Sequence, residues 1–224
     1  MSKYHTGATY IAFEGIDGCG KSTMIEEIAS LLRRTGYDVA VVHEPGTTPM
    51  AADIRKLAKS PEYTETITPI TEMLLMSAAR SQLLENIVRP ALAANKIVLS
   101  DRSYLSTLAY QGTDYVNLEH CITLTELVVN DTKPDLIIYM DVDPKVGLER
   151  AGNRAALDRI ESKGCEYFNK VRRRFKQLAI DYANVTEINA SGTRAENFVQ
   201  CWGLVSQLLA SRETVDLTKE VPHV

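Results

Sequence analysis

The chain has 224 residues, of which 45% are hydrophobic and 24% are charged, and its formal net charge is −4. This length and composition are typical of one folded domain over residues 1–224, and they exclude disordered, fibrous and collagen-like proteins. The acidic balance gives no general attraction to polyanions, so it argues against nucleic acid as a partner. Any phosphate binding must then come from a local cluster of positive charge.

The sequence contains no leader-like apolar run and no stretch that approaches about 20 uninterrupted apolar residues, so we expect no signal peptide and no membrane partner. The four cysteines, Cys19, Cys121, Cys165 and Cys201, form no CxxC pair and have no neighbouring histidine. This pattern favours reduced thiols over zinc ligands or disulfides, and therefore a cytoplasmic protein.

Short apolar or β-branched runs alternate along the chain with longer helical patterns, which is the signature of βαβ units. The five runs are Tyr10 to Phe13, Val39 to Val42, Ile97 to Leu99, Leu136 to Met140 and Val185 to Ile188. The third and fourth are continuously apolar, as expected for central strands covered on both faces. The sequence therefore predicts an α/β fold with a parallel sheet and helices on both of its faces.

Three segments between or after these runs carry apolar residues at helical spacing. The stripes are Met24, Ile28, Leu31 and Leu32; Leu84, Ile87, Val88 and Ala91; and Phe198, Trp202, Val205 and Leu209. We interpret these residues as core packing. The last residues, 212–224, are expected to form a loosely held tail.

The strongest chemical signal directly follows the first predicted strand. Residues Gly15 to Ser22 read Gly-Ile-Asp-Gly-Cys-Gly-Lys-Ser and match the phosphate-loop pattern G-x-x-x-x-G-K-[ST]. In such a loop, backbone N–H groups and the N-terminus of the next helix surround phosphate, the lysine adds a mobile charge, and the serine binds Mg²⁺. The segment therefore predicts nucleotide binding.

Other motifs narrow the class of nucleotide-binding protein. The sequence nearest to the guanine-reading N-K-x-D motif is Asn169-Lys170-Val171-Arg172, where arginine replaces the carboxylate, so a GTPase is disfavoured. The third strand ends in Asp101-Arg102 instead of the Asp-Glu of motor ATPases. An aspartate beside an arginine at a strand end suits a site that holds both a metal ion and a second phosphate. These features favour a small-molecule kinase.

The chain resembles the thymidylate kinase family from about Tyr10 to Phe198. The matching segments are Phe13 to Thr23, Glu44-Pro45-Gly46, Ala78-Ala79-Arg80, Asp101-Arg102, Ser106 to Gln111, Pro134-Asp135-Leu136 and Leu157 to Glu161. The resemblance implies a P-loop kinase fold with a five-stranded parallel sheet, a homodimer, and transfer of the γ-phosphoryl of ATP to dTMP. Two alternatives stay open: a broader deoxynucleoside monophosphate kinase, and a nucleotide-binding regulatory protein without turnover.

The resemblance assigns the donor side of the reaction to the phosphate loop. Lys21, Asp101 and Arg102 are expected to be catalytic, and Mg²⁺ is expected at Ser22 and Asp101. The residues expected to bind ATP are Gly15, Asp17, Gly18, Cys19, Gly20, Lys21, Ser22, Thr23 and Arg150.

The acceptor side is assigned in the same way. The residues expected to bind dTMP are Asp17, Arg55, Met76, Arg80, Arg102, Ser106, Thr107, Tyr110 and Gln111. Asp17 could instead cap a helix, and Arg80 could be a surface arginine. Met76 stands where the family commonly has a phenylalanine that stacks on thymine, and a thioether is a less selective surface than an aromatic ring.

Residues 150–160 resemble the lid of the family, a segment that closes over the phosphates. Some members carry an arginine in the P-loop and others supply it from the lid. The variable loop positions here are Ile-Asp-Gly-Cys, so the resemblance implies the lid form, with Arg154 as the first choice of cation and Arg159 and Arg150 next. A solvated basic helix end is the alternative reading.

Overall fold

The computed structural model describes residues 7–60, 62–113, 116–153 and 158–219. The strands are β1 (Thr9–Glu14), β2 (Val39–His43), β3 (Ile97–Asp101), β4 (Leu136–Asp141) and β5 (Val185–Asn189). All five predicted strands are therefore confirmed, and each continues one or two residues past the predicted run.

The helices lie between and after these strands. They are α1 (Lys21–Arg34), α2 (Pro49–Lys59), α3 (Pro69–Leu83), α4 (Arg89–Ala93), α5 (Tyr104–Tyr110), α6 (Leu118–Val129), α7 (Pro144–Gly152), α8 (Gly164–Asp181) and α9 (Arg194–Lys219), with a π-helical turn η1 (Leu84–Val88) and a 3-10 turn η2 (Glu161–Lys163). Helix α9 continues into the segment 212–224. The looseness expected of that tail stays a prediction.

The strands form one parallel sheet in the order β2-β3-β1-β4-β5. Phe13 lies opposite Asp101 of β3, and Asp101 in turn lies opposite His43 of β2. The carboxyl ends of these three strands are thus level at one edge of the sheet. Loops that follow the carboxyl ends of parallel strands form the usual ligand crevice of such folds, so the register brings the phosphate loop and the segment Asp101-Arg102 together.

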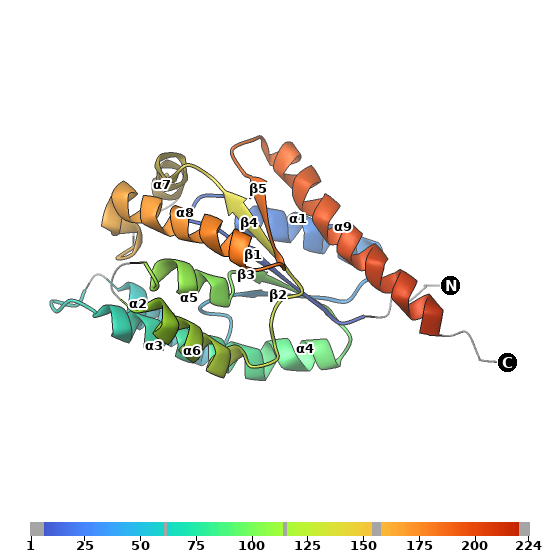
Figure 1. Cartoon of the computed structure of the whole chain (residues 1–224), viewed down its shortest axis with the longest axis horizontal. Coiled ribbons are helices and arrows are strands. Elements are labelled where there is room, and N and C mark those ends of the chain that lie inside the picture. The colour runs from blue at the N-terminus through green and yellow to red at the C-terminus, as the bar shows by residue number, and fades with distance from the viewer. Residues whose placement is uncertain (1–6, 61, 114–115, 154–157, 220–224) are drawn as a thin grey trace.

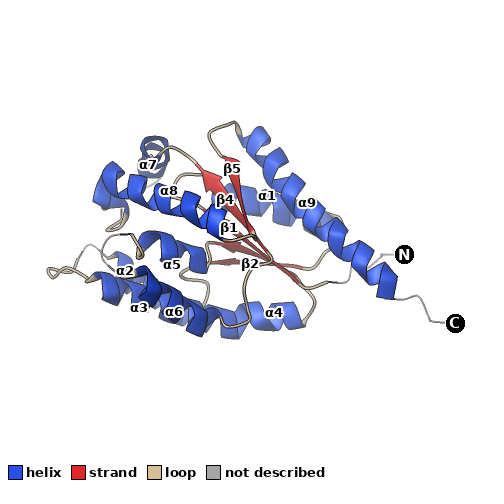
Figure 2. Ribbon diagram, viewed as in Figure 1, coloured by secondary structure: helices blue, strands red, loops and turns tan. Residues whose placement is uncertain are grey.

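Helices cover both faces of the sheet, as predicted (Figure 1). Helices α1 and α9 pack against each other and against one face, while α4, α5 and α8 lie on the other (Figure 2). Strands β1 and β4 are buried along their whole length, whereas the outer strands β2 and β5 alternate between buried and more exposed residues. This difference explains why the central strands read as continuous apolar runs.

Helix α8 is fixed to the sheet by a ring stack and an ion pair. The Phe175 ring is stacked on Tyr139 of β4 at 5.0 Å between centroids. The Arg172 guanidinium binds both carboxylate oxygens of Asp141, at 2.7 and 2.8 Å. This pairing outweighs the effect of burial and lowers the pKa of Asp141 to about 2. The carboxyl end of β4 is therefore held by the helix that covers it.

The predicted helical stripe from Leu84 to Ala91 departs from regular α-helix. It crosses the π-helical turn η1 before α4 begins. Pro90 is the second residue after this turn, and it has no N–H to donate and a ring that crowds the carbonyl four residues earlier. A widened turn relieves that crowding, so Leu84, Val88 and Ala91 stay buried although the spacing changes.

Within the described part of the chain, no helix is long and apolar enough to cross a membrane.

Candidate functional site

The phosphate loop joins β1 to α1 and is held by its own lysine. Lys21 is only 6% exposed, and its Nζ donates to the carbonyl oxygens of Gly15 at 3.0 Å and Ile16 at 3.1 Å. The side chain of Cys19, also in this loop, is buried, and burial raises the pKa of its thiol, so in the fold it acts as a packing residue. The loop thus has the shape of an anion cradle with its cation folded back onto backbone oxygens.

A hydroxyl and a carboxylate meet beside this loop. The Ser22 hydroxyl donates to Oδ2 of Asp101 at 2.6 Å. Ser22 lies in the first turn of α1 and Asp101 ends β3, so the contact joins the two elements predicted to meet here. Hard oxygen donors of this kind are the ligands that Mg²⁺ prefers, and the pair fits the expected ion together with phosphate oxygens. Thr23, the next residue of α1, is half-buried.

Arg102 follows Asp101 and turns its guanidinium toward the phosphate loop. Its backbone adopts φ 77°, a left-handed conformation that is costly for a non-glycine residue. Its Nη1 donates to the Gly15 carbonyl at 3.0 Å and to Ser106 Oγ at 3.2 Å, and its Nη2 donates to Asp17 Oδ1 at 2.9 Å. The guanidinium also lies 5.1 Å from the Tyr110 ring centre. Four contacts of three chemical kinds, namely hydrogen bonds, an ion pair and a cation–ring contact, therefore fix this cation.

Asp17 is the acidic member of this group. Burial would raise the pKa of its carboxyl, but the neighbouring Arg102 and Lys21 outweigh burial and hold the pKa well below its usual value. Asp17 is therefore an anion at neutral pH. Its carboxylate is paired with Arg102 and lines a small pocket beside the loop, so it does not act only as a helix cap.

Glu14, which sequence reasoning did not single out, orders the residues after Arg102. Its side chain is fully buried at the end of β1 and accepts from Ser103 N at 2.7 Å, Ser103 Oγ at 2.9 Å, Ser106 N at 3.0 Å and Ser106 Oγ at 2.6 Å. These are the first turn and N-cap of α5, where a carboxylate satisfies free N–H groups. A charged residue inside a fully buried strand is the sequence signal that could have identified it.

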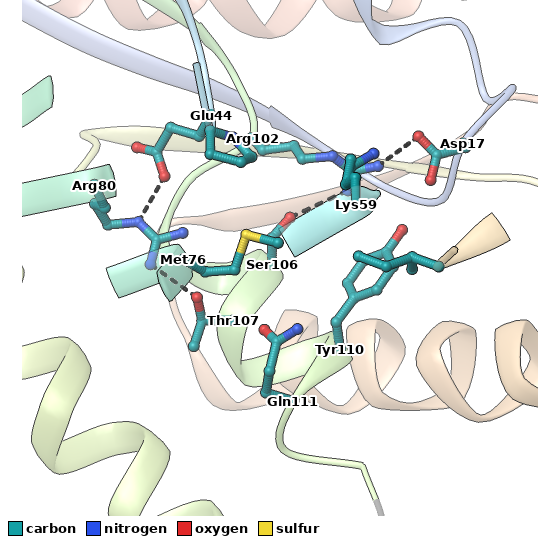
Figure 3. A pocket seen from close by; sticks show the side chains of 12 residues that line it. Asp17, Glu44, Lys59, Met76, Arg80, Arg102, Ser106, Thr107, Tyr110 and Gln111 are labelled. Carbon is teal, nitrogen blue, oxygen red and sulfur yellow. Dashed lines mark hydrogen bonds and ion pairs between the residues drawn. The ribbon is translucent and has the colours of Figure 1, made fainter. Parts of the chain in front are cut away.

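A small pocket of about 50 Å³ opens next to a larger cleft of about 450 Å³, and Asp17, Lys59 and Arg102 line both. The cleft also contains Lys21, Ser22 and Asp101. The predicted dTMP-binding residues that line the small pocket are Asp17, Met76, Arg80, Arg102, Ser106, Thr107, Tyr110 and Gln111 (Figure 3). The remaining one, Arg55, lines the cleft, and its Nη1 donates to the Pro45 carbonyl at 3.1 Å.

Arg80 is a buried arginine of α3, not a surface residue. It is 4% exposed, and its three nitrogens donate to Glu44 Oε2 at 2.6 Å, Thr107 Oγ1 at 2.8 Å and the Ser103 carbonyl at 2.8 Å. Burial raises the pKa of Glu44, against the opposing effect of Arg80, and Glu44 Oε1 has no hydrogen-bond partner among the described residues. Figure 3 shows Arg80, Thr107 and Gln111 on one side of the pocket, with Arg102 and Tyr110 toward the other.

Of the three predicted lid arginines, the structure describes Arg150 and Arg159. Arg154 lies outside the described residues. Arg150, in the last turn of α7, is exposed. The Arg159 guanidinium pairs with Glu72 of α3 and donates to the Ala58 carbonyl of α2 at 2.9 Å, so in this structure it is bound to these two helices and not to the phosphate loop.

Two further charged groups near the predicted lid were missed by sequence reasoning. Lys59 lines both cavities and pairs with Asp158 at 2.6 Å. Glu72 is 3% exposed and pairs with Arg159 of the predicted lid and with Lys163, which follows it. The partners lie 99 and 87 residues apart in the chain, so no local pattern could reveal the pairs.

A family model and the similar proteins compared all point to the same enzyme family. The Thymidylate kinase family model matches residues 13–200. Thymidylate kinase from Pseudoalteromonas translucida is 43% identical over 183 residues, which cover 81% of this chain and 88% of that protein. Thymidylate kinase from Vibrio vulnificus is 42% identical over 185 residues, with 82% and 87% covered.

A solved structure gives the same answer for the fold. The crystal structure of thymidylate kinase from Ehrlichia chaffeensis superposes with a TM-score of 0.67 at 28% identity, and the match covers 81% of this chain and 93% of that one. The five-stranded parallel sheet predicted from the sequence is thus the sheet of a known family.

Two glycines with nearly equal backbone angles provide a test of the phosphate loop. Gly18 has φ +78° and Gly164 has φ +79°, so alanine at either position costs about 1–2 kcal/mol of left-handed strain. Only at Gly18 would the new Cβ meet backbone, 2.0 Å from the Gly147 carbonyl oxygen of α7. We expect Gly18→Ala to weaken ATP binding by about 10-fold or more, measured by calorimetry, because the loop must move. Gly164→Ala should retain ATP affinity, and equal losses in the two variants would contradict this account.

Proposed function

The chain belongs to the thymidylate kinase family and phosphorylates dTMP, and we propose residue roles for transfer of the γ-phosphoryl group of ATP to dTMP. In this reaction an oxygen of the dTMP phosphate attacks the γ-phosphorus, the bond to the β–γ bridging oxygen breaks, and dTDP and ADP leave. The nucleophile is already anionic, so the protein's work is positioning and neutralising charge.

A shared backbone oxygen is the observation that carries the proposal. Lys21 from the phosphate loop and Arg102 from the end of β3 both donate to the Gly15 carbonyl, each at 3.0 Å. Two cations from different elements therefore converge on one point at the border of the cleft and the small pocket. Phosphate oxygens of ATP and dTMP would replace that carbonyl as acceptors, with Lys21 on the donor and Arg102 on the acceptor phosphate.

The other site residues take roles that follow from their places. Asp17, held by Arg102 and facing the pocket, orients the 3′-hydroxyl of the acceptor sugar. Arg80 and Thr107 bind the edge of the thymine base, and Met76 packs on its face. Tyr110 limits space at the sugar 2′ position, and Arg55 assists with the acceptor phosphate from the adjoining cleft.

Mg²⁺ belongs to this proposal as the partner of ATP, the phosphoryl donor that the family uses. Ser22 and Asp101 would hold the ion together with phosphate oxygens, an arrangement supported by their 2.6 Å contact. When bound, the ion would supply positive charge that neutralises the phosphates of ATP. The chain's own part is to keep a hydroxyl and a carboxylate side by side at the mouth of the phosphate loop.

We assign the chain to the form of the family that takes its transition-state arginine from the lid. The phosphate loop offers Ile16, Asp17, Gly18 and Cys19 at its variable positions, none of which is cationic. Arg154 remains the first candidate. Arg159 could reach the transferred phosphoryl group only after its ion pair with Glu72 breaks. Arg150 lies in the last turn of α7.

Intact cations and a metal-binding pair favour an enzyme over a regulatory protein that only binds nucleotide. A site without turnover has no need for Lys21 and Arg102 to face one another. The broader deoxynucleoside monophosphate kinase differs only in base selectivity.

We also propose a cytoplasmic location, supported by free thiols at all four cysteines, the form that a reducing compartment maintains.

A homodimer is the proposed assembly, supported by exposed apolar side chains on the packed helices α2 and α3. These are Met50, Leu57, Ile70 and Leu74, which are 58%, 47%, 56% and 51% exposed. Sedimentation velocity should show a dimer at micromolar concentration, and Leu74→Glu should weaken it because a charge would be buried. Ile180→Glu, at a 79% exposed position on α8, is the matched control. A monomeric wild type, or equal effects of both variants, would refute this assembly.

The acceptor range is tested by measuring ADP release with dTMP, dUMP, dCMP, dGMP and dAMP. We expect the highest kcat/KM for dTMP. Aromatic stacking adds about 0.5–1.5 kcal/mol, or roughly 2- to 13-fold, so Met76→Phe should widen the preference for dTMP over dUMP by up to that factor. An equal ratio in both forms would mean that residue 76 does not face the base. Comparable rates with all five nucleotides would favour the broader kinase.

The lid assignment predicts a specific kinetic pattern for Arg154→Ala. Because the lid cation matters most as charge develops on the transferred group, kcat should fall by about 100-fold or more with a smaller change in ATP affinity. Arg173→Ala, at an exposed arginine of α8, should leave both quantities near wild type. If only the KM for ATP rises, Arg154 is a binding contact and another cation acts in the transition state.

A further inference from the structure

Glu72 is a buried carboxylate that the proposed reaction does not use. It lies on α3 four residues before Met76 and eight before Arg80, so the three side chains share one face of the helix. One of its oxygens, Oε1, accepts from Gln111 Nε2 at 2.6 Å. The other, Oε2, pairs with Arg159 and lies 3.4 Å from Lys163 Nζ. Glu72 therefore contacts a residue of the base pocket without itself lining that pocket.

The charge of Glu72 decides how the Gln111 amide is turned. Burial alone would raise the pKa of Glu72, but Lys163, Arg159 and Gln111 together lower the pKa below its usual value. An ionised carboxylate only accepts hydrogen bonds, so Gln111 must present its NH₂ group to Glu72. The reverse orientation would place the amide oxygen against a negative charge. The neighbouring charge thus fixes the orientation of the Gln111 amide.

The pocket is left with a defined pattern of donors and acceptors. Gln111 lines the pocket and keeps its carbonyl oxygen and one N–H for a ligand. Arg80 is a pure donor, and its contacts with Glu44, Thr107 and Ser103 leave one N–H on each terminal nitrogen. A base that matches needs a carbonyl oxygen for Arg80 and an adjacent ring N–H for Gln111. Thymine and uracil carry this edge, whereas cytosine has an amino group and a bare ring nitrogen there.

We propose that Glu72 is a positioning residue that fixes the hydrogen-bond polarity of the base pocket through Gln111. By holding the amide in one orientation, it selects acceptor nucleotides whose base has a carbonyl beside a ring N–H. Arg159 and Lys163 pair with the second carboxylate oxygen and leave the contact with Gln111 to the first. This inference rests on the proposed function, because it takes the small pocket to be the site of the acceptor base.

The test compares dUMP with dCMP, which have nearly the same size and differ at this edge. In Glu72→Gln the new amide can donate as well as accept, so Gln111 is free to turn over. We expect the ratio of kcat/KM for dUMP to that for dCMP to fall by about 10-fold or more, the effect of one mismatched polar contact. A merely structural role would lower both values together and leave the ratio unchanged, and that result would overturn the proposal.

Lys163→Met is the matched control, because it removes a cation from Oε2 and keeps the Gln111 contact. Its ratio should stay within about 2-fold of wild type, and a fall as large as that of Glu72→Gln would overturn the proposal. If Glu72→Gln does not fold, Gln111→Met replaces it as the test. It removes the carbonyl that reads the base, so an unchanged ratio there would overturn the inference.

Calorimetric binding of dUMP and dCMP to the wild-type chain without ATP separates this inference from the proposed function. If dUMP binds more tightly than dCMP but no phosphoryl group reaches dTMP when ATP and Mg²⁺ are supplied in a separate assay, the inference stands and the function is refuted. Transfer to dTMP together with equal binding of dUMP and dCMP would support the function and refute the inference.

Discussion

Buried and half-buried cations need partners, and this requirement organises the whole site. A guanidinium or ammonium removed from water costs several kcal/mol unless a carboxylate or carbonyl replaces its hydration. Here Arg102 is paired with Asp17, Arg80 with Glu44 and Arg159 with Glu72. Each pair crosses between elements that are far apart in the chain. The ion pairs therefore position the loops at the carboxyl edge of the sheet as well as neutralising charge.

The same pairs leave the cations ready for substrate. Each guanidinium has more N–H groups than its protein partners occupy. Arg80 and Arg102 both line the small pocket, so their remaining N–H groups are available to a ligand there. A cation held in place before the substrate arrives stabilises developing charge without reorganising. This arrangement also explains how a chain of net charge −4 can attract two phosphorylated ligands, since the positive charge is local to one cleft.

The sequence predicted what depends on local pattern. Five apolar runs identified all five strands, because burial on two faces leaves a continuous apolar signature, and the phosphate-loop motif located Lys21 and Ser22. Helix spacing could not reveal the π turn before Pro90, since the apolar positions there stay buried. The sequence assigned no role to the carboxylates Glu14, Glu44 and Glu72 for a different reason. Their partners lie 89, 36 and 87 residues away, so only the folded chain brings them together.

The claim that buried carboxylates act by positioning cations is tested most directly by a double-mutant cycle on Glu44 and Arg80. Binding of dTMP is measured by calorimetry for wild type, Glu44→Gln, Arg80→Met and the double variant. If Glu44 acts only through Arg80, the double variant should bind dTMP about as weakly as Arg80→Met alone. Losses that simply add in the double variant would contradict this account, because they would mean that Glu44 affects dTMP independently of the arginine.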